Sequence, residues 1–359
     1  MADPRVARLR LIRTPSIGPI TYRQLIARFG SAEAAIAALP DLAARGGGRA
    51  PKVVDASAAE REIAATEKLG ARYLFLDDAD YPPLLAELDS APVAMTIRGD
   101  LALTKRTTVA MVGARNASAA ACRFARGLAV ELGREGVVIV SGLARGLDTA
   151  AHNGSLATGT IGVIASGIDI AFPPENRDLQ EAVAQQGLLI AEQPPGMEPL
   201  ARNFPHRNRI IAGLAVGTVV VEAAPKSGSL ITARLANEAG RDVMAVPGSP
   251  LDPRAQGCNQ LIRDGATLVQ SAADILESIR PIGARMVRSP ASGFDAMPPA
   301  EPGDADRRAV AGLLGPVPVA VDELIRQSAL PPAIVATVLL ELELAGRLER
   351  HAGGRVSLT

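Results

Sequence analysis

The chain has 359 residues, of which 48% are hydrophobic and 21% are charged, which predicts two or three globular domains rather than a disordered protein. Its 38 Lys and Arg residues balance its 38 Asp and Glu residues, which excludes a protein coated in positive charge and allows only a local nucleic-acid site. The two cysteines, Cys122 and Cys258, lie far apart without a CxxC or His-rich neighbour, so we expect no disulfide framework and no metal site.

The sequence predicts neither a secretion signal nor a membrane span. Residues 1–13 mix Asp3 and several arginines with isolated apolar residues, unlike the apolar core of a signal peptide. The longest uncharged apolar run, residues 210–221, is shorter than the roughly 20 residues that cross a bilayer. We therefore expect a cytoplasmic protein without a membrane partner.

Residues 1–70 form the first predicted domain, which is helical. Ala-rich helical patterns are separated by turn signals at residues 16–19, 29–31 and 40–41. The turn at 16–19 and the amphipathic helix after it resemble a helix-hairpin-helix or SAM-like unit, in which backbone N–H groups can approach a phosphate. A small helical packing domain is the simpler alternative.

Residues 71–280 predict an α/β domain, a Rossmann-like doubly wound and mostly parallel sheet. Several of its strands are apolar throughout, as strands buried on both faces by helices must be. Glycine-containing turns follow the strands, so the functional residues of these loops are expected at the carboxyl edge of the sheet, where such folds bind ligands. The expected strands are residues 73–76, 109–112, 137–140, 161–165, 188–191, 219–221 and 243–246.

The remaining residues predict a linker and a third domain. Residues 281–305 are rich in Pro, Gly, Ser and Ala, which favours a flexible linker. Residues 306–359 predict three helices and a hairpin at Gly353-Gly354, the outline of a winged helix. The candidate recognition helix, residues 333–343, is apolar with two acids and no cation, so we expect it to pack against protein rather than read DNA.

Two strand-glycine-helix turns are candidate anion sites. A helix N-terminus presents unpaired N–H groups and partial positive charge, and an arginine at the turn adds a forked donor. Such turns are common, so an ordinary turn with a surface arginine is the alternative. The residues that we expect to contact the anion are Gly113, Arg115, Ser118, Ser141, Gly142 and Arg145.

Ser141, Asp148 and His152 also invite interpretation as a catalytic triad. Asp148 and His152 are four residues apart on a predicted helix and can touch. Ser141, however, does not lie in a GxSxG nucleophile elbow. A capping aspartate with a packed histidine is the interpretation we favour.

A cationic stretch surrounds Phe204. Within residues 197–221 the only acid is Glu198, whereas three arginines and a histidine cluster near the ring. Single-stranded nucleic acid requires this combination, because cations bind phosphates and a ring stacks on a base. Alternatively, Phe204 fills the core and one arginine pairs with Glu192 or Glu222. The candidate contacts are Phe204, Arg207, Asn208 and Arg209.

The loop after the strand at 219–221 offers a further phosphate cradle. It carries Lys226, Ser227, Gly228 and Ser229 immediately before a predicted helix. The P-loop spacing GxxxxGK[ST] is absent, so nucleotide hydrolysis is not indicated. A helix cap would explain the serines but not the lysine.

Seven motifs, taken together, resemble those of the DNA-processing protein A (DprA/Smf) family. In chain order they are GARNAS, SGLARGLDTAAH, FPPENRDL, FPHRNRIIAG, PKSGSLITA, GRDVMAVPG and GCNQLIRDGA. The resemblance implies a protein that binds single-stranded DNA in natural transformation, protects it, and helps load RecA recombinase in place of single-strand binding protein. It implies neither catalysis nor a cofactor.

The resemblance also implies roles for individual residues. Arg115, Arg207, Arg209 and Lys226 would contact DNA, with Phe204 as a stacking ring. The family forms homodimers through the Rossmann-like domain. The residues implied in that interface are Asn259, Leu261, Ile262 and Leu268.

The alternative function is enzymatic. Rossmann-like relatives of the lysine-decarboxylase-like group hydrolyse nucleoside monophosphates as phosphoribohydrolases, using an Arg, a Glu and a PGGxGT loop. Here the corresponding loop carries Lys226 and Ser227 without the glycine pair, which disfavours this reaction.

Overall fold

The computed structural model describes residues 3–280, 301–351 and 353–359. The chain divides into two compact units, one comprising Met1–Glu60 with Arg285–Thr359 and the other Arg61–Ala284. We call them the terminal unit and the central unit, and each is described by itself. The linker predicted at 281–305 lies largely outside the described residues.

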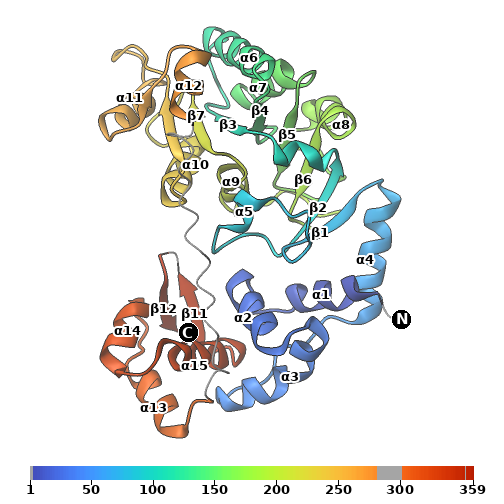
Figure 1. Ribbon diagram of the computed structural model, residues 1–359, viewed down its shortest axis with the longest axis vertical. Coiled ribbons are helices and arrows are strands. Elements are labelled where there is room, and N and C mark those ends of the chain that lie inside the picture. The colour runs from blue at the N-terminus through green and yellow to red at the C-terminus, as the bar shows by residue number, and fades with distance from the viewer. Residues whose placement is uncertain (1–2, 281–300, 352) are drawn as a thin grey trace. The chain divides into compact units, whose positions relative to one another are not determined.

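The central unit is built on a sheet that has nine strands within the described residues (Figure 1). The order is β1-β2-β6-β5-β4-β3-β7-β8-β9. The strands from β6 to β9 in this order pair in parallel, whereas β2 pairs antiparallel with both of its neighbours, β1 and β6. This arrangement confirms the predicted mostly parallel sheet. The strands are β1 Arg72–Phe75, β2 Ala94–Gly99, β3 Thr108–Val112, β4 Val138–Ser141, β5 Thr160–Ile164, β6 Leu188–Ala191, β7 Gly217–Val220, β8 Asp242–Ala245 and β9 Thr267–Leu268.

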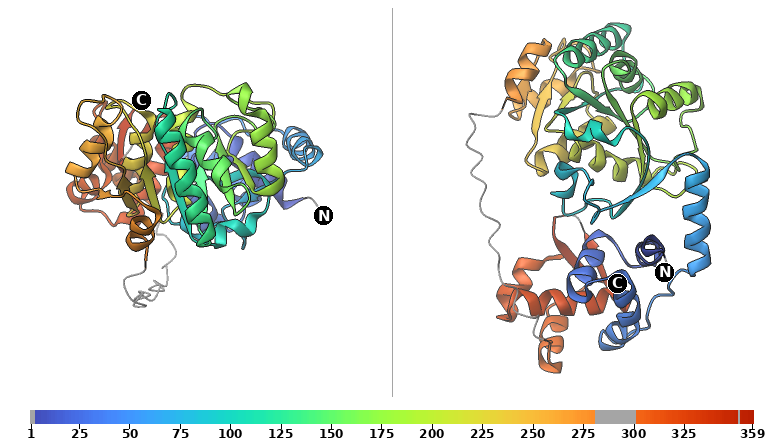
Figure 2. Two further views of the ribbon diagram at one scale, coloured as in Figure 1. Left: turned by 90° about the horizontal axis from the view of Figure 1, so that it is seen from above. Right: turned by 45° about the vertical axis from the view of Figure 1, so that its right-hand side comes forward.

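Helices cover both faces of this sheet (Figure 2). Helices α6, α7, α8 and α12 bury one face, and α5, α9, α10 and α11 bury the other. Strands β3 to β7 are buried throughout, which is why their sequences are apolar rather than alternating. The helices of this unit are α5 Pro83–Ala86, α6 Ala119–Arg134, α7 Leu147–Ser155, α8 Arg177–Gln186, α9 Asn203–Gly213, α10 Gly228–Glu238, α11 Gln256–Arg263 and α12 Ala272–Ser278, and α4 Ala56–Lys68 contains the boundary between the two units.

The strand order reverses next to β3. The chain runs from β3 through β4 and β5 to β6 on one side, and β7, β8 and β9 continue on the other side. The crevice at the carboxyl ends of β3 and β7 is therefore the topological switch point, where open α/β sheets bind ligands.

Within the described part of the central unit, two strands were missed by the sequence prediction. The segment of β2 has few β-branched apolar residues, and β9 is two exposed residues long, so neither produces a clear strand pattern. Both are defined by their pairing with neighbouring strands.

The terminal unit contains a group of N-terminal helices and a winged-helix fold, as predicted. In the winged-helix fold, the described residues form three helices and a small sheet of order β10-β12-β11. The predicted turn at residues 40–41 is wrong, because Pro40 lies exposed inside α3 while its neighbours Leu39 and Leu42 are buried and keep the helix in place. The elements are α1 Pro4–Arg13, α2 Pro19–Phe29, α3 Ala32–Arg45, α13 Asp304–Gly312, β10 Val319–Ala320, α14 Val321–Ser328, α15 Pro332–Leu344, β11 Leu348–His351 and β12 Arg355–Leu358.

Helix α15, at the place of a recognition helix, is buried along almost its whole length. It packs against α3, and the hydroxyl of Thr21 in α2 donates a hydrogen bond of 2.8 Å to the carboxylate of Glu343. The backbone at Gly46 approaches α15 so closely that a Cβ there would overlap the carbonyl of Glu341. The sequence expectation that this helix packs against protein is thus confirmed.

Among the described residues, no single helix is long and apolar enough to cross a membrane. The pair α14 and α15, bent by 119°, would pass such a test together by length and composition.

Candidate nucleic-acid interface

A cavity of about 580 Å³ opens at the switch point of the central unit. Its walls come from the loop after β3, the loop after β7, and the first turns of α7, α9 and α10. The two loops are held together because the carbonyl of Glu222 accepts a hydrogen bond of 2.7 Å from the N–H of Ala114. Parallel neighbouring strands thus bring together loops that lie about a hundred residues apart in sequence.

Two exposed cations and an aromatic ring line this cavity. Arg115 follows β3, and Lys226 follows β7. The guanidinium of Arg115 lies 5.1 Å from the centre of the Phe204 ring, a cation–π contact. Phe172 places its ring centre 5.6 Å from that of Phe204. The arrangement offers positive charge beside an extended apolar platform.

Arg207 forms a buried wall of the cavity. Only 6% of the residue is exposed, and its Nη1 donates a hydrogen bond of 2.7 Å to the carbonyl of Val163 in β5. Burial lowers the pKa of Arg207 to about 10, opposed by the nearby charge of Asp148. A side chain at Gly142 would overlap the Arg207 guanidinium, so only glycine permits this approach.

Asp148 is the buried counter-charge of Arg207. Burial raises the pKa of Asp148, while the charge of Arg207 and backbone N–H groups, among them that of Ala144, oppose this rise. The Ala144 N–H donates to the Asp148 carboxylate at 3.3 Å. The pair therefore fixes the loop after β4 in the wall of the cavity.

Other predicted residues are engaged within the protein. Arg209 does not line the cavity; it is 12% exposed and ion-paired with Glu192, as one sequence alternative proposed. Ser118 caps α6 and donates from its backbone N–H (2.9 Å) and its hydroxyl (2.8 Å) to the buried carboxylate of Glu222. Arg145 pairs with Glu175.

The smaller groups of the predicted set lie at or beside the cavity. Asn208, Ser227, Gly228 and Ser229 line it, and Ser227 caps α10 by accepting from the Ser229 N–H at 3.4 Å. Gly142 and Arg145 line an adjacent cavity of about 130 Å³, which shares Arg115, Phe204 and Arg207 with the first.

Ser141, Asp148 and His152 do not form a catalytic triad. The Ser141 hydroxyl donates to the carbonyl of Met111 at 2.6 Å, and Nδ1 of His152 contacts the Thr160 hydroxyl at 2.7 Å. Nε2 of His152 is buried and has no partner among the described residues. The packed histidine that the sequence favoured is what the structure contains.

The predicted dimer residues lie at one edge of the central unit. Asn259 is used internally, since its side chain exchanges hydrogen bonds of 3.1 and 3.0 Å with the backbone of Gly248. Leu261 and Ile262 in α11 are half-buried, and Leu268 is 46% exposed on β9, the last strand in the sheet order.

Comparison with known families matches almost the whole chain. Residues 72–280 match the model of DNA recombination-mediator protein A, residues 2–65 a DprA-like N-terminal HHH domain, and residues 294–354 a DprA winged helix domain. The chain belongs to the DNA recombination-mediator protein A family.

Individual relatives agree with this assignment. The chain is 47% identical over 206 residues to the DNA processing protein DprA of Streptococcus pneumoniae, covering 57% of this chain and 72% of the relative. The X-ray structure of the S. pneumoniae protein aligns with a TM-score of 0.65 and 36% identity, covering 77% of this chain and 98% of that chain. A Helicobacter pylori structure describing that protein's single-stranded DNA binding mode aligns with a TM-score of 0.53 and 28% identity, covering 58% and 95%.

Sequence reasoning missed three residues that shape this family member's cavity. Glu222 ties the loops after β3 and β7 together, Phe172 extends the aromatic platform, and Asn116 lines the wall. Glu222 directly follows a buried strand, and the neighbouring buried strand ends in a glycine turn. This pattern is a signal that could have identified Glu222. Phe172 gave no local signal of stacking, because its partner Phe204 lies in α9, a later segment of the chain.

His152 should make the protein sensitive to mild acid. Burial, followed by the charge of Arg207, lowers the pKa of His152 to about 3, whereas an unfolded histidine titrates near 6.5. The unfolded state therefore binds the proton first, and stability is lost as the pH falls below about 6.5, by up to about 1.4 kcal/mol per pH unit. Urea unfolding at several pH values should show a smaller loss in His152→Gln, whereas exposed His206→Gln should behave like the parent. This assignment would be contradicted if the free energy of unfolding decreased equally with falling pH in the parent and in His152→Gln.

Proposed function

We propose that this protein binds single-stranded DNA along the cavity at the carboxyl ends of β3 and β7. The observation that carries the proposal is the convergence of Arg115, Lys226 and Phe204 on one cavity, with buried Arg207 in its wall. Arginine and lysine bind backbone phosphates without reading sequence, and aromatic rings stack on any base. The site therefore favours flexible single strands with little sequence preference.

Charge distribution supports the proposal further. The chain as a whole is neutral, yet Arg115 and Lys226 make no ion pair within the described residues and remain available to an anionic ligand. The N-terminus of α10, which begins at Gly228 beside Lys226, adds the partial positive charge of the helix dipole at the same place. The relatives described as DNA processing proteins, and the H. pylori protein described as binding single-stranded DNA, are consistent with this role.

We also propose a wider role, which the resemblance to the family supports. The protein would protect DNA taken up in natural transformation and help load RecA recombinase in place of single-strand binding protein, in the cytoplasm and without catalysis. It would act as a homodimer through the edge formed by α11 and β9, where Leu268 is exposed on a terminal strand that another chain could extend.

Titration of the full chain with oligo(dT) at several salt concentrations tests the proposal. Affinity should fall steeply as salt rises, with a slope of about −0.7 per neutralised phosphate, because binding releases counterions. Absence of binding at low salt would exclude the proposed function. A parallel incubation with AMP should yield no adenine, whereas the phosphoribohydrolase alternative requires its release.

A further inference from the structure

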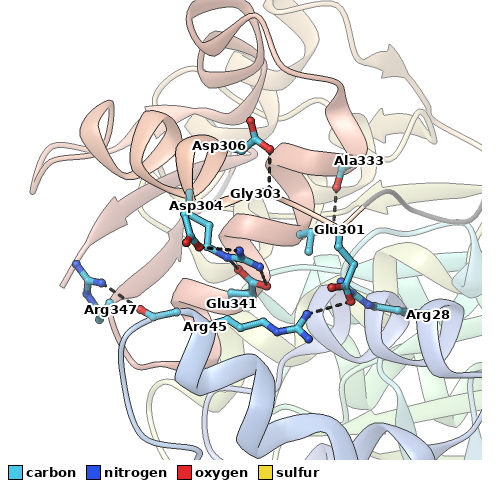
Figure 3. A network of polar contacts seen from close by, with 12 residues as sticks. Arg28, Arg45, Glu301, Gly303, Asp304, Asp306, Ala333, Glu341 and Arg347 are labelled. Atoms are coloured by element: carbon cyan, nitrogen blue, oxygen red, sulfur yellow. Dashed lines mark hydrogen bonds and ion pairs between the residues drawn. The ribbon is translucent and has the colours of Figure 1, made fainter.

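The terminal unit contains a second combination of arginines and an aromatic ring, outside the cavity described above. One Glu301 oxygen accepts from Nη2 of Arg28 at 3.3 Å and from Nη1 of Arg45 at 3.0 Å (Figure 3). Arg28 lies at the end of α2 and Arg45 at the end of α3, whereas Glu301 precedes α13. One carboxylate from a distant part of the chain thus joins two guanidinium groups.

Arg28 is held in place independently of Glu301. Its guanidinium carbon lies 5.6 Å from the centre of the Phe29 ring. The side chain is 14% exposed, and Nη1 is buried and has no hydrogen-bond partner among the described residues. A buried donor without a partner indicates capacity for a further acceptor at this place.

These residues line a cavity of about 280 Å³, together with Ala38, Asp41 and Leu42. The pairing of an arginine with a phenylalanine repeats the relation between Arg115 and Phe204 in the central unit. Asp41 is the one other acid in the lining and reduces the positive potential of the cavity without pairing with either arginine in the described structure.

Glu301 occupies the position that an anionic ligand would take. Hydrogen bonding and charge from Arg45, with the charge of Arg28, lower the pKa of Glu301, so the carboxylate is ionised at neutral pH. Yet its side chain is 62% exposed. Exposed ion pairs contribute little net stability, so a ligand with more charge and more contacts can replace such a carboxylate.

We infer that Arg28, Phe29 and Arg45 form a second contact for single-stranded DNA, in which a backbone phosphate replaces the Glu301 carboxylate and a base lies against Phe29. A phosphodiester fits because two arginines can hold its two free oxygens, and because its binding also releases counterions. The inference rests on the proposed function. It adds a second DNA contact, whose arginines are occupied by the Glu301 carboxylate when DNA is absent.

Glu301→Gln tests the displacement, because it keeps the shape of the side chain and removes its charge. In the full chain, affinity for oligo(dT) at low salt should rise about threefold or more, and the salt slope should steepen by about 0.7, corresponding to one more phosphate. The control is Glu323→Gln, which removes the same charge from an exposed pair with Arg326 on α14 and should change neither quantity. Arg45→Ala introduced into Glu301→Gln should abolish the gain.

A cross-linking experiment keeps the test independent of any change in folding. Oligo(dT) carrying 5-iodouracil, irradiated with the unaltered chain at low salt, should cross-link to the peptide that contains Phe29, and Arg45→Ala should remove this product. Two results would overturn the inference, provided that oligo(dT) binds through the central unit. One is that Glu301→Gln leaves the affinity and the salt slope unchanged, and the other is that no cross-link forms at Phe29. If no form of the chain binds oligo(dT), it is the proposed function itself that fails.

Discussion

Alanine at both Arg115 and Lys226 should lower the affinity for oligo(dT) about a hundredfold at low salt, or about tenfold for each cation. Both side chains are exposed at the cavity and have no ion pair within the described structure, so their removal takes away phosphate contacts without breaking internal ones. The salt slope should therefore become shallower by about 1.4, since each lost phosphate contact contributes about 0.7. Fluorescence anisotropy at four or five salt concentrations measures both quantities.

Two variants serve as controls for this experiment. Arg234→Ala removes a cation from the same helix as Ser229 but from an exposed pair with Glu238, and should leave binding nearly unchanged. Phe204→Ala should weaken binding with little change of slope, because stacking involves no counterion. Equal losses from Arg234→Ala and from the double variant would indicate a general charge effect and contradict the proposed site.

Arg207→Ala should destabilise the central unit by about 3–5 kcal/mol, because it leaves the buried carboxylate of Asp148 without its partner. Burial already raises the pKa of Asp148, and loss of Arg207 removes a charge that opposes this rise. A raised pKa means that the folded state binds the proton more tightly than the unfolded state. The destabilisation is thus fully present above the folded pKa and is relieved as the pH falls through it.

The same pair supplies the control. Asp148→Asn introduced into Arg207→Ala removes the unpaired charge, so it should recover much of the lost stability and abolish the extra pH dependence. Urea unfolding of the parent protein and the two variants measures these differences in stability. A loss below about 1 kcal/mol for Arg207→Ala would show that the pair is solvated like a surface ion pair. DNA binding should be compared only under conditions where each variant is folded.

The difference between Arg207 and Arg209 illustrates what the sequence could not decide. Both arginines belong to one cationic stretch, and from the sequence both were expected to contact DNA. Residues two apart on a helix point in different directions, so α9 can direct only one of them toward the cavity. The Val163 carbonyl in β5 accepts a hydrogen bond from Arg207, whereas Arg209 pairs with Glu192.

The apolar strands, the glycine turns after them and the order of the motifs were enough to predict the doubly wound sheet, the winged helix and the edge that holds the cavity. These features are local, because burial on both faces and tight turns constrain residue type wherever they occur. Contacts between distant segments were decided only by the tertiary structure: Glu222 with Ser118, Phe172 with Phe204, and Glu301 with Arg28 and Arg45. Each depends on which strands and helices become neighbours, and residue patterns along one segment do not encode the identity of its partner in space.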